Sequence, residues 1–207
     1  RRLKRLFPTG RILIVIREQH DAIASTYMQY IRRSGTKTLR QFLSQHSIPG
    51  YFSFSYEHFE YHRLISLYIS LFGSDRVLAL PFEYFVQDRV GFVRRIADFS
   101  GCFDIDPDGL DFKVEAAGDP ESLCFVLRRL NHFRADAVHP EPVINLGRFA
   151  SFVYNGVSFT GRHIRWLKHV RPIKQEVRNI VHFDYRPSNK ITQTLVERPE
   201  FMERYLT

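Results

Sequence analysis

The chain has 207 residues, of which 44% are hydrophobic and 14% aromatic, enough to bury one sizeable core. Its formal net charge of +8 favours anionic partners, but the charge is spread along the chain and no signature of a common nucleic-acid-binding module is present. Two cysteines, Cys102 and Cys124, exclude a disulfide framework and a zinc site, and no apolar run approaches the ~20 residues that span a bilayer.

These exclusions lead to several expectations about surroundings and partners. We expect no specific nucleic acid partner, no metal and no transmembrane segment. No signal peptide is recognisable, so we expect a cytoplasmic protein whose two cysteines are core thiols of a reducing compartment. The chain opens without Met, in what resembles the tail of a helix, so we also expect the sequence to be part of a longer protein.

The first elements in the chain form a strand–helix–strand pattern. Residues 11–16, "RILIVI", contain five consecutive apolar side chains, mostly β-branched, which predicts a central parallel strand covered on both faces. Residues 76–82 predict a second short buried strand. Between them the apolar spacing predicts three helices, over 19–33, Leu39–Gln45 and Tyr56–Phe72. Together they form a βαβ unit, whose crossover should be right-handed.

The remainder of the chain is expected to be mostly helical. The predicted segments are helices over Val90–Gly101 and Pro120–Phe133, a turn over 104–109, a proline-containing connection over 135–147, and helical stretches within 161–181 and 188–199. No internal repeat or low-complexity linker stands out. We therefore predict one α/β domain over 1–207, with a parallel sheet flanked by helices and a helix-rich C-terminal half.

A charged residue follows the first predicted strand directly. Arg17 stands past the carboxyl end of that strand, where open α/β sheets bind ligands, and its rigid fork suits phosphate oxygens. A helix N-terminus follows within a few residues, and Ser25 lies on the same helical face as Asp21. The residues alone leave two interpretations open: a phosphate site, or a structural Arg17 paired with Asp21 or Glu18 beside a surface serine.

Here the sequence resembles the sulfotransferases that use 3′-phosphoadenosine 5′-phosphosulfate (PAPS). "RILIVIREQHDAIASTYMQYIRR" is similar to their 3′-phosphate-binding segment, which has a hydrophobic strand, an arginine, often an acidic residue four positions on, and a serine eight positions on. Arg17, Asp21 and Ser25 fall at those positions. The usual proline is replaced here by Gln19 or His20.

A second block supports the resemblance. Residues 56–101 look like the family's next segment, with a helix, Phe-Gly, a strand, an aromatic–Glu pair at "PFEYF" and a helix ending at Gly101. "LRRLNHF" and "YRPSNKITQTL" further on resemble segments of prokaryote-type members. The resemblance implies a fold like that of the P-loop nucleotide hydrolases, and a structural role for Glu83 in the loop after its strand.

The resemblance also implies a reaction. Arg17 and Ser25 would hold the 3′-phosphate of PAPS, and the enzyme would move a sulfuryl group to an acceptor hydroxyl or amine without needing a metal. The acceptor would be a small molecule, a carbohydrate or a lipid; its identity and the oligomeric state are not readable from the sequence. Asp21 would cap or orient its helix.

The family's 5′-phosphosulfate loop and catalytic base should precede Arg11, and only ten residues do so here. We therefore expect the N-terminal strand–loop–helix of the domain to lie before Arg1, and no catalytic residue can be named. The segment "RRSGTKTL" looks like a phosphate loop but lacks a preceding strand. We interpret it as a helix–turn–helix link with Gly35 as the helix C-cap.

Other candidate residues are weaker. His20 sits close to the presumed donor site, and His58 and His62 are four apart on a helix but lack a third metal ligand. The acceptor-side candidates are Trp166, the aromatic stretch Arg148–Phe159 and the loop Gly50–Tyr56.

Two other functions remain open. One is a non-catalytic module that binds adenosine 3′,5′-bisphosphate or another polyanion. The other is a nucleotide kinase, for which the sequence lacks a Walker loop.

Overall fold

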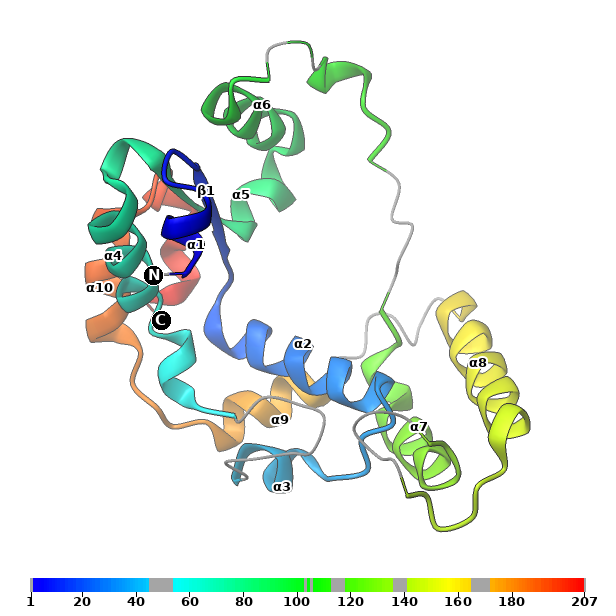
Figure 1. Ribbon diagram of the computed structural model, residues 1–207. Helices are drawn as coiled ribbons and strands as arrows, with labels where there is room; N and C mark the ends of the chain where they lie inside the picture. The colour runs from blue at the N-terminus through cyan, green and yellow to red at the C-terminus, as the bar shows by residue number, and fades with distance from the viewer. Residues whose placement is uncertain are drawn as a thin grey trace. The chain divides into compact units, whose positions relative to one another are not determined.

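The computed structural model describes residues 2–44, 54–102, 104, 106–112, 118–135, 141–164 and 172–206 (Figure 1). The chain divides into two compact units. Unit 1 contains Arg1–Gln19, Glu57–Lys113 and Asp184–Thr207, and unit 2 contains His20–Tyr56 and Val114–Phe183. The expectation that 1–207 forms a single domain stays a prediction, and each unit is described separately below.

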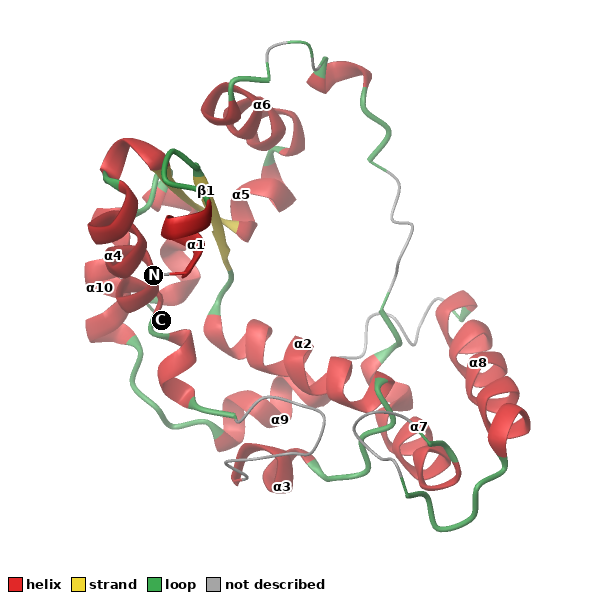
Figure 2. Ribbon diagram, in the orientation of Figure 1, coloured by secondary structure: helices red, strands yellow, loops and turns green. Residues whose placement is uncertain are grey.

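Unit 1 contains both strands of the described chain (Figure 2). Its elements are α1 (Arg2–Leu6), β1 (Ile12–Ile16), α4 (Tyr61–Phe72), β2 (Val77–Pro81), α5 (Phe82–Gln87), α6 (Arg89–Ser100), α10 (Arg186–Leu195) and a C-terminal 3-10 segment (Pro199–Tyr205). The two strands are parallel and run in register from Ile12 opposite Val77 to Ile16 opposite Pro81. The predicted α/β class with parallel strands flanked by helices is confirmed.

The core of unit 1 lies on both faces of β2 but on one face of β1. Ile14 and Ile16 of β1 pack in one cluster with Ile65 of α4 and with Met202 and Tyr205 near the C-terminus. The other cluster joins β2 to α5 and α6 through Leu78, Leu80, Tyr84 and Phe92.

The opposite face of β1 is open to solvent. Leu13 and Val15 are 41% and 46% exposed, and among the described residues β1 pairs only with β2. The prediction that this strand is covered on both faces is therefore wrong for the described chain, because α5 and α6 lie over β2 and not over β1.

Helix α6 of unit 1 begins and ends at residues that are typical helix caps. Asp88 caps α6, its carboxylate accepting a hydrogen bond from the Gly91 N–H at 2.8 Å. Gly101 ends α6 in the left-handed conformation, with φ of 79°. The helix predicted over Tyr56–Phe72 is interrupted: a 3-10 turn covers Tyr56–Phe59, and α4 begins only at Tyr61.

The regular elements in the described part of unit 2 are all helices. It contains nearly all of α2 (Gln19–Arg32), followed by α3 (Leu39–Ser44), α7 (Cys124–Leu130), α8 (Gly147–His163) and α9 (Pro172–Ile180). The predicted helix-rich C-terminal half is confirmed, although 3-10 turns flank α7 within the helix expected over Pro120–Phe133. Of the helical stretch expected within 161–181, residues 165–171 lie outside the described residues.

Aromatic rings fill the core of unit 2. Tyr27 and Tyr30 of α2 pack against Phe42 of α3 with ring centroids 5.4 and 5.1 Å away. Cys124 is buried beside them, and burial raises the pKa of its thiol to about 11. Cys102 is exposed, so the expectation of two core thiols holds for Cys124 alone. Cys102 directly follows the exposed C-cap Gly101, which places it at the surface.

The ion pair between Arg95 and Glu197 yields a stability prediction. Nε and Nη2 of Arg95 each lie 2.5 Å from a carboxylate oxygen of Glu197, joining α6 to the segment after α10. Hydrogen bonds from Arg95 hold the pKa of Glu197 below its ordinary value of 4.5. The stabilisation is therefore present above pH 4.5, and it is lost as the pH falls through the lowered pKa.

We expect Glu197→Gln to lower the free energy of unfolding at neutral pH by less than about 1 kcal/mol, because the pair is partly exposed. The difference from wild type should vanish in acid. Urea denaturation of both proteins across this pH range measures it, with Glu203→Gln, an exposed and unpaired site in the described part of unit 1, as the control. A difference that does not change with pH would contradict the assignment.

Candidate functional site

The candidate site lies at the carboxyl end of β1. Arg17 follows the last residue of the strand and is half-buried. Its guanidinium lies over the Phe82 ring, 5.3 Å from the centroid, and makes no hydrogen bond or ion pair with the described part of unit 1. A permanent charge that is held over an aromatic ring but has no carboxylate partner is available to an anion. The alternative of a structural Arg17 paired with Glu18 is not what the structure contains.

A buried carboxylate holds the backbone of this turn. The register of the strands places the residues after β1 beside the start of α5, so Glu83 reaches across to the turn. One oxygen of Glu83 accepts the Glu18 N–H at 3.2 Å, and the other accepts the Tyr205 hydroxyl at 2.6 Å. Tyr61 donates its hydroxyl to the Arg17 carbonyl at 2.7 Å. The backbone on both sides of the Arg17 side chain is therefore fixed.

The pKa values of the two tyrosines support these roles. Burial first, and then the Glu83 carboxylate, raise the pKa of Tyr205 well above its usual value. Burial also raises the pKa of Tyr61. Both hydroxyls therefore keep their protons and act as donors at neutral pH. The contacts of Glu83 agree with the structural role that the sequence implied for it.

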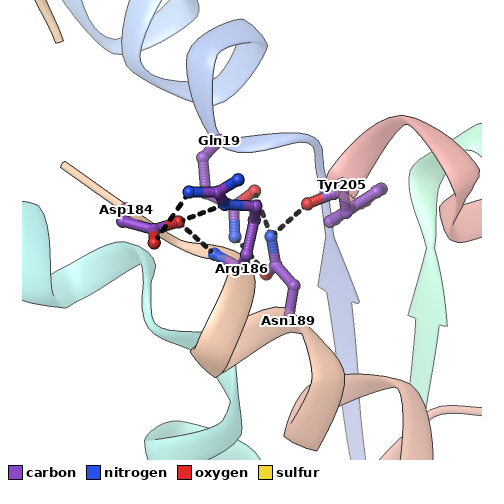
Figure 3. A network of polar contacts seen from close by, with 5 residues as sticks. All are labelled: Gln19, Asp184, Arg186, Asn189 and Tyr205. Carbon is purple, nitrogen blue, oxygen red and sulfur yellow. Dashed lines mark hydrogen bonds and ion pairs between the residues drawn. The ribbon is translucent and has the colours of Figure 1, made fainter. Parts of the chain in front are cut away.

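A second polar network ties the start of α2 to the C-terminal part of unit 1 (Figure 3). The side-chain amide of Gln19 donates to Asn189 at 2.6 Å, and Asn189 in turn donates to the Tyr205 carbonyl at 2.6 Å. Gln19 and Asn189 are completely or almost completely buried. Because both are amides, they can satisfy one another without a net charge.

The same view shows a charge pair at the start of α10. Asp184 accepts hydrogen bonds from Nε and Nη2 of Arg186, at 2.8 and 3.1 Å, and from its backbone N–H (Figure 3). These bonds lower the pKa of Asp184 and raise that of Arg186. Arg186 is therefore already engaged with a carboxylate, in contrast to Arg17.

Ser25 belongs to unit 2. It is exposed on α2 and faces a cavity of about 300 Å³ together with Arg32 of the same helix. Asp21, one turn before it, is buried and forms an ion pair with Lys174 at 2.5 Å. That pair supports the orienting role expected for Asp21. Because Arg17 lies in unit 1 and Ser25 in unit 2, their joint binding of one phosphate stays a prediction.

The glycine-containing segment after α2 is a helix end. Ser34 and Gly35 donate their N–H groups back to Ile31 and Tyr30, in the pattern of a Schellman turn. The left-handed residue is Ser34, with φ of 63°, so the prediction that Gly35 is the C-cap is wrong by one position. Glycine is needed at 35 because an added Cβ would lie 2.3 Å from the Tyr30 ring.

The N–H groups of this segment have partners. The Tyr30 hydroxyl accepts hydrogen bonds from the N–H groups of Thr36 and Lys37, at 3.2 and 3.0 Å. A phosphate loop needs such donors to point outward to a ligand. The segment is therefore a link between α2 and α3, as interpreted from the sequence.

Among the described residues, the remaining histidine candidates do not assemble into a metal site. His62 contacts the Ser188 hydroxyl at 2.8 Å, and the described residues contain no group of three or more His, Cys, Asp or Glu side chains that could hold a metal ion. Trp166 and residues 50–53 lie outside the described residues.

Within the described chain, none of the helices combines the length and apolar character that a membrane crossing requires.

Residues 148–159 divide between the two sides of α8. Ala150 and Tyr154 are buried, whereas Phe149, Phe152 and Phe159 are exposed. The aromatic stretch is therefore partly core and partly surface.

A comparison with protein-family models matches residues 1–106 to the sulfotransferase family. These residues are half of the chain, and they include β1, the turn with Arg17, α2 and β2. The chain belongs to the sulfotransferase family. The resemblance inferred from the sequence is thereby confirmed.

The other comparisons add little for this sulfotransferase-family chain. No curated protein matches it. The crystal structure of a sulfotransferase from Alicyclobacillus acidocaldarius is similar over 55% of this chain and 49% of that one, at 23% identity and a TM-score of 0.41. The chain thus spans about half the length of that structure, and a similarity this low transfers no site.

The Glu83–Tyr205 contact yields a prediction for the site. Tyr205→Phe leaves a buried carboxylate oxygen without its donor, so the free energy of unfolding should fall by about 1–3 kcal/mol. Tyr68→Phe is the matched control, because the Tyr68 hydroxyl has no hydrogen bond within the described part of unit 1. Urea unfolding of the three proteins measures the effect. Equal loss in both variants would show that the Glu83 contact does not hold the turn.

Proposed function

We propose that this chain carries the 3′-phosphate-binding half of a PAPS-dependent sulfotransferase. The observation that supports this most is Arg17: a guanidinium without an ion pair in the described part of unit 1 stands at the carboxyl end of a parallel strand, on a turn fixed by hydrogen bonds to its backbone. Ligands of open α/β sheets bind at that edge. The family match covers this same segment.

The roles of the two predicted residues follow from their chemistry. Arg17 would bind two oxygens of the 3′-phosphate in a bidentate way, and the Ser25 hydroxyl would donate to a third. The 3′-phosphate distinguishes PAPS from ATP, so these contacts would give donor specificity as well as affinity. Transfer of the sulfuryl group to an acceptor hydroxyl or amine would be in-line, with positioning and charge stabilisation supplying most of the catalysis.

The 5′-phosphosulfate loop and the catalytic base would come from a strand–loop–helix that precedes Arg1. The open side of β1 supports this part of the proposal. Parallel sheets are normally covered on both faces. A sheet of only two strands is at best marginally stable by itself. A further strand beside β1 would enlarge the sheet, and a helix over Leu13 and Val15 would cover the exposed face of β1. The acceptor class and the cytoplasmic location stay predictions from the sequence.

The first test is calorimetric titration of the chain with adenosine 3′,5′-bisphosphate, using adenosine 5′-phosphate as the control ligand. Only the 3′-phosphorylated ligand should bind. Arg17→Ala should weaken its binding by about 1.5–3 kcal/mol, roughly 10- to 100-fold, as expected for the loss of charged hydrogen bonds. Arg5→Ala is the matched control and should bind as wild type does, because Arg5 is exposed on α1 and has no ion pair among the described residues of unit 1.

Binding of both ligands with equal affinity would contradict the assignment of Arg17. Binding of the 3′-phosphorylated ligand without sulfuryl transfer, in a chain extended to include the upstream segment, would favour a non-catalytic bisphosphate-binding module instead.

Ser25→Ala tests the second residue separately. A neutral hydroxyl contributes less than a guanidinium, so affinity for adenosine 3′,5′-bisphosphate should fall by about 0.5–1.5 kcal/mol. The variant should leave the free energy of unfolding unchanged, because Ser25 is exposed. Unchanged affinity in the same titration would remove Ser25 from the donor site and leave Arg17 as its anchor.

A further inference from the structure

A cavity in unit 2 has charged groups of both signs on its walls. It measures about 300 Å³ and is lined by Ser25, Met28, Gln29 and Arg32 of α2 and by Gly118 and Asp119 of the segment before α7. This volume is at the small end of ligand pockets and suits a molecule the size of an amino acid. The function proposed above uses only Ser25 at its rim.

The wall from α2 offers free hydrogen-bonding groups. Its residues are three or four positions apart, so their side chains project from one face of the helix. Ser25, Gln29 and Arg32 make no side-chain hydrogen bond or ion pair within the described part of unit 2. The Arg32 guanidinium therefore presents to the cavity donors that no described residue of unit 2 occupies.

Asp119 lines the cavity opposite α2, and its side chain is held in place by hydrogen bonds. Its carboxylate accepts hydrogen bonds from Tyr154, at 3.1 Å, and from Ser158. Both hydroxyls come from the buried face of α8, where each residue is only 3% exposed. Burial, and then the charge of Asp119, raise the pKa of Tyr154, so its hydroxyl keeps the proton that it donates. The carboxylate is thus held in one orientation.

A second set of contacts ties the region of Tyr154 to α2. The Arg134 guanidinium lies 3.9 Å from the centre of the Tyr154 ring and donates to Asn131 at 3.1 Å. Asn131 in turn donates to the carbonyls of Ile31 and Gly35 at the end of α2. The two walls of the cavity are therefore connected through a chain of side-chain contacts within one unit.

Neither charged side chain of the cavity has an ion-pair partner in the described part of unit 2. Arg32 and Asp119 form no ion pair with each other or with any other described residue of unit 2. A ligand with one negative group would meet the carboxylate unfavourably, and a purely apolar ligand would leave both charges unpaired. A ligand with a charge of each sign can satisfy both walls.

We propose that this cavity binds a small zwitterion of the amino-acid class, with the ligand carboxylate on Arg32 and the ligand ammonium on Asp119. Gln29 supplies a further hydrogen bond, and Met28 contacts the aliphatic part of the ligand. The site stands on contacts within unit 2 and does not depend on the Arg17 site.

The test compares L-serine with ethanolamine and 3-hydroxypropionate, which lack its carboxylate and its ammonium group respectively. Ligand-observed NMR titrations of the whole chain give the dissociation constants. L-serine should bind with a constant on the order of 1 mM, and each single-charge analogue about 10-fold more weakly. Arg32→Gln should weaken L-serine by a similar factor, whereas Arg33→Gln, an exposed neighbour outside the cavity, should bind as wild type does.

Asp119→Asn tests the other wall and needs a check of folding, because Tyr154 and Ser158 donate to this carboxylate. Arg32 is exposed, so its variant keeps the test valid if Asp119→Asn does not fold. No binding of L-serine, equal binding of the analogues, or equal loss in Arg32→Gln and Arg33→Gln would each overturn the proposal. So would binding of inorganic phosphate in place of L-serine, since it would make the cavity an anion site.

Discussion

The buried carboxylate of Glu83 is the constraint on which the candidate donor site depends. It sits at the start of α5 and accepts one hydrogen bond from the turn after β1 and one from Tyr205 near the C-terminus. Burial of a carboxylate is costly unless both oxygens are satisfied. Three segments of unit 1 must therefore come together before the turn has its final form, and the Arg17 side chain projects from that turn.

Arg17 and Arg32, the arginines at the two candidate sites, differ from Arg95 and Arg186 in their lack of a carboxylate partner. Arg95 and Arg186 are each bound to a carboxylate in a bidentate way. Arg17 and Arg32 are not, within the described part of their own units. A guanidinium that folding leaves without a carboxylate retains its full capacity for a ligand. This property marks a candidate binding residue only together with a place on a fixed turn, as for Arg17, or on a cavity wall, as for Arg32.

Much of the fold could be predicted because its signals are local. The apolar run of β1, the glycine after α6 and the helical spacing of α2 each act within a few residues of the element they specify. The wrong predictions concern features that depend on residues packed nearby in space. Leu13 and Val15 are as apolar as a buried strand requires, yet their exposure depends on which helices cover β1. Ser34, not Gly35, takes the left-handed position, and Gly35 is instead required by the Tyr30 ring that lies against it.

The sequence by itself determined the family, the two apolar runs that become the strand pair and the position of Arg17, since the motif of each lies within a short stretch of chain. Only the tertiary structure decided that Glu83 and Tyr205, 122 positions apart, share one hydrogen bond. It alone placed Asp119 and Arg32 on one cavity. The physical reason is that a side chain's partners are set by packing between distant segments, and a hydrogen bond or charge pair leaves no periodic trace in the sequence.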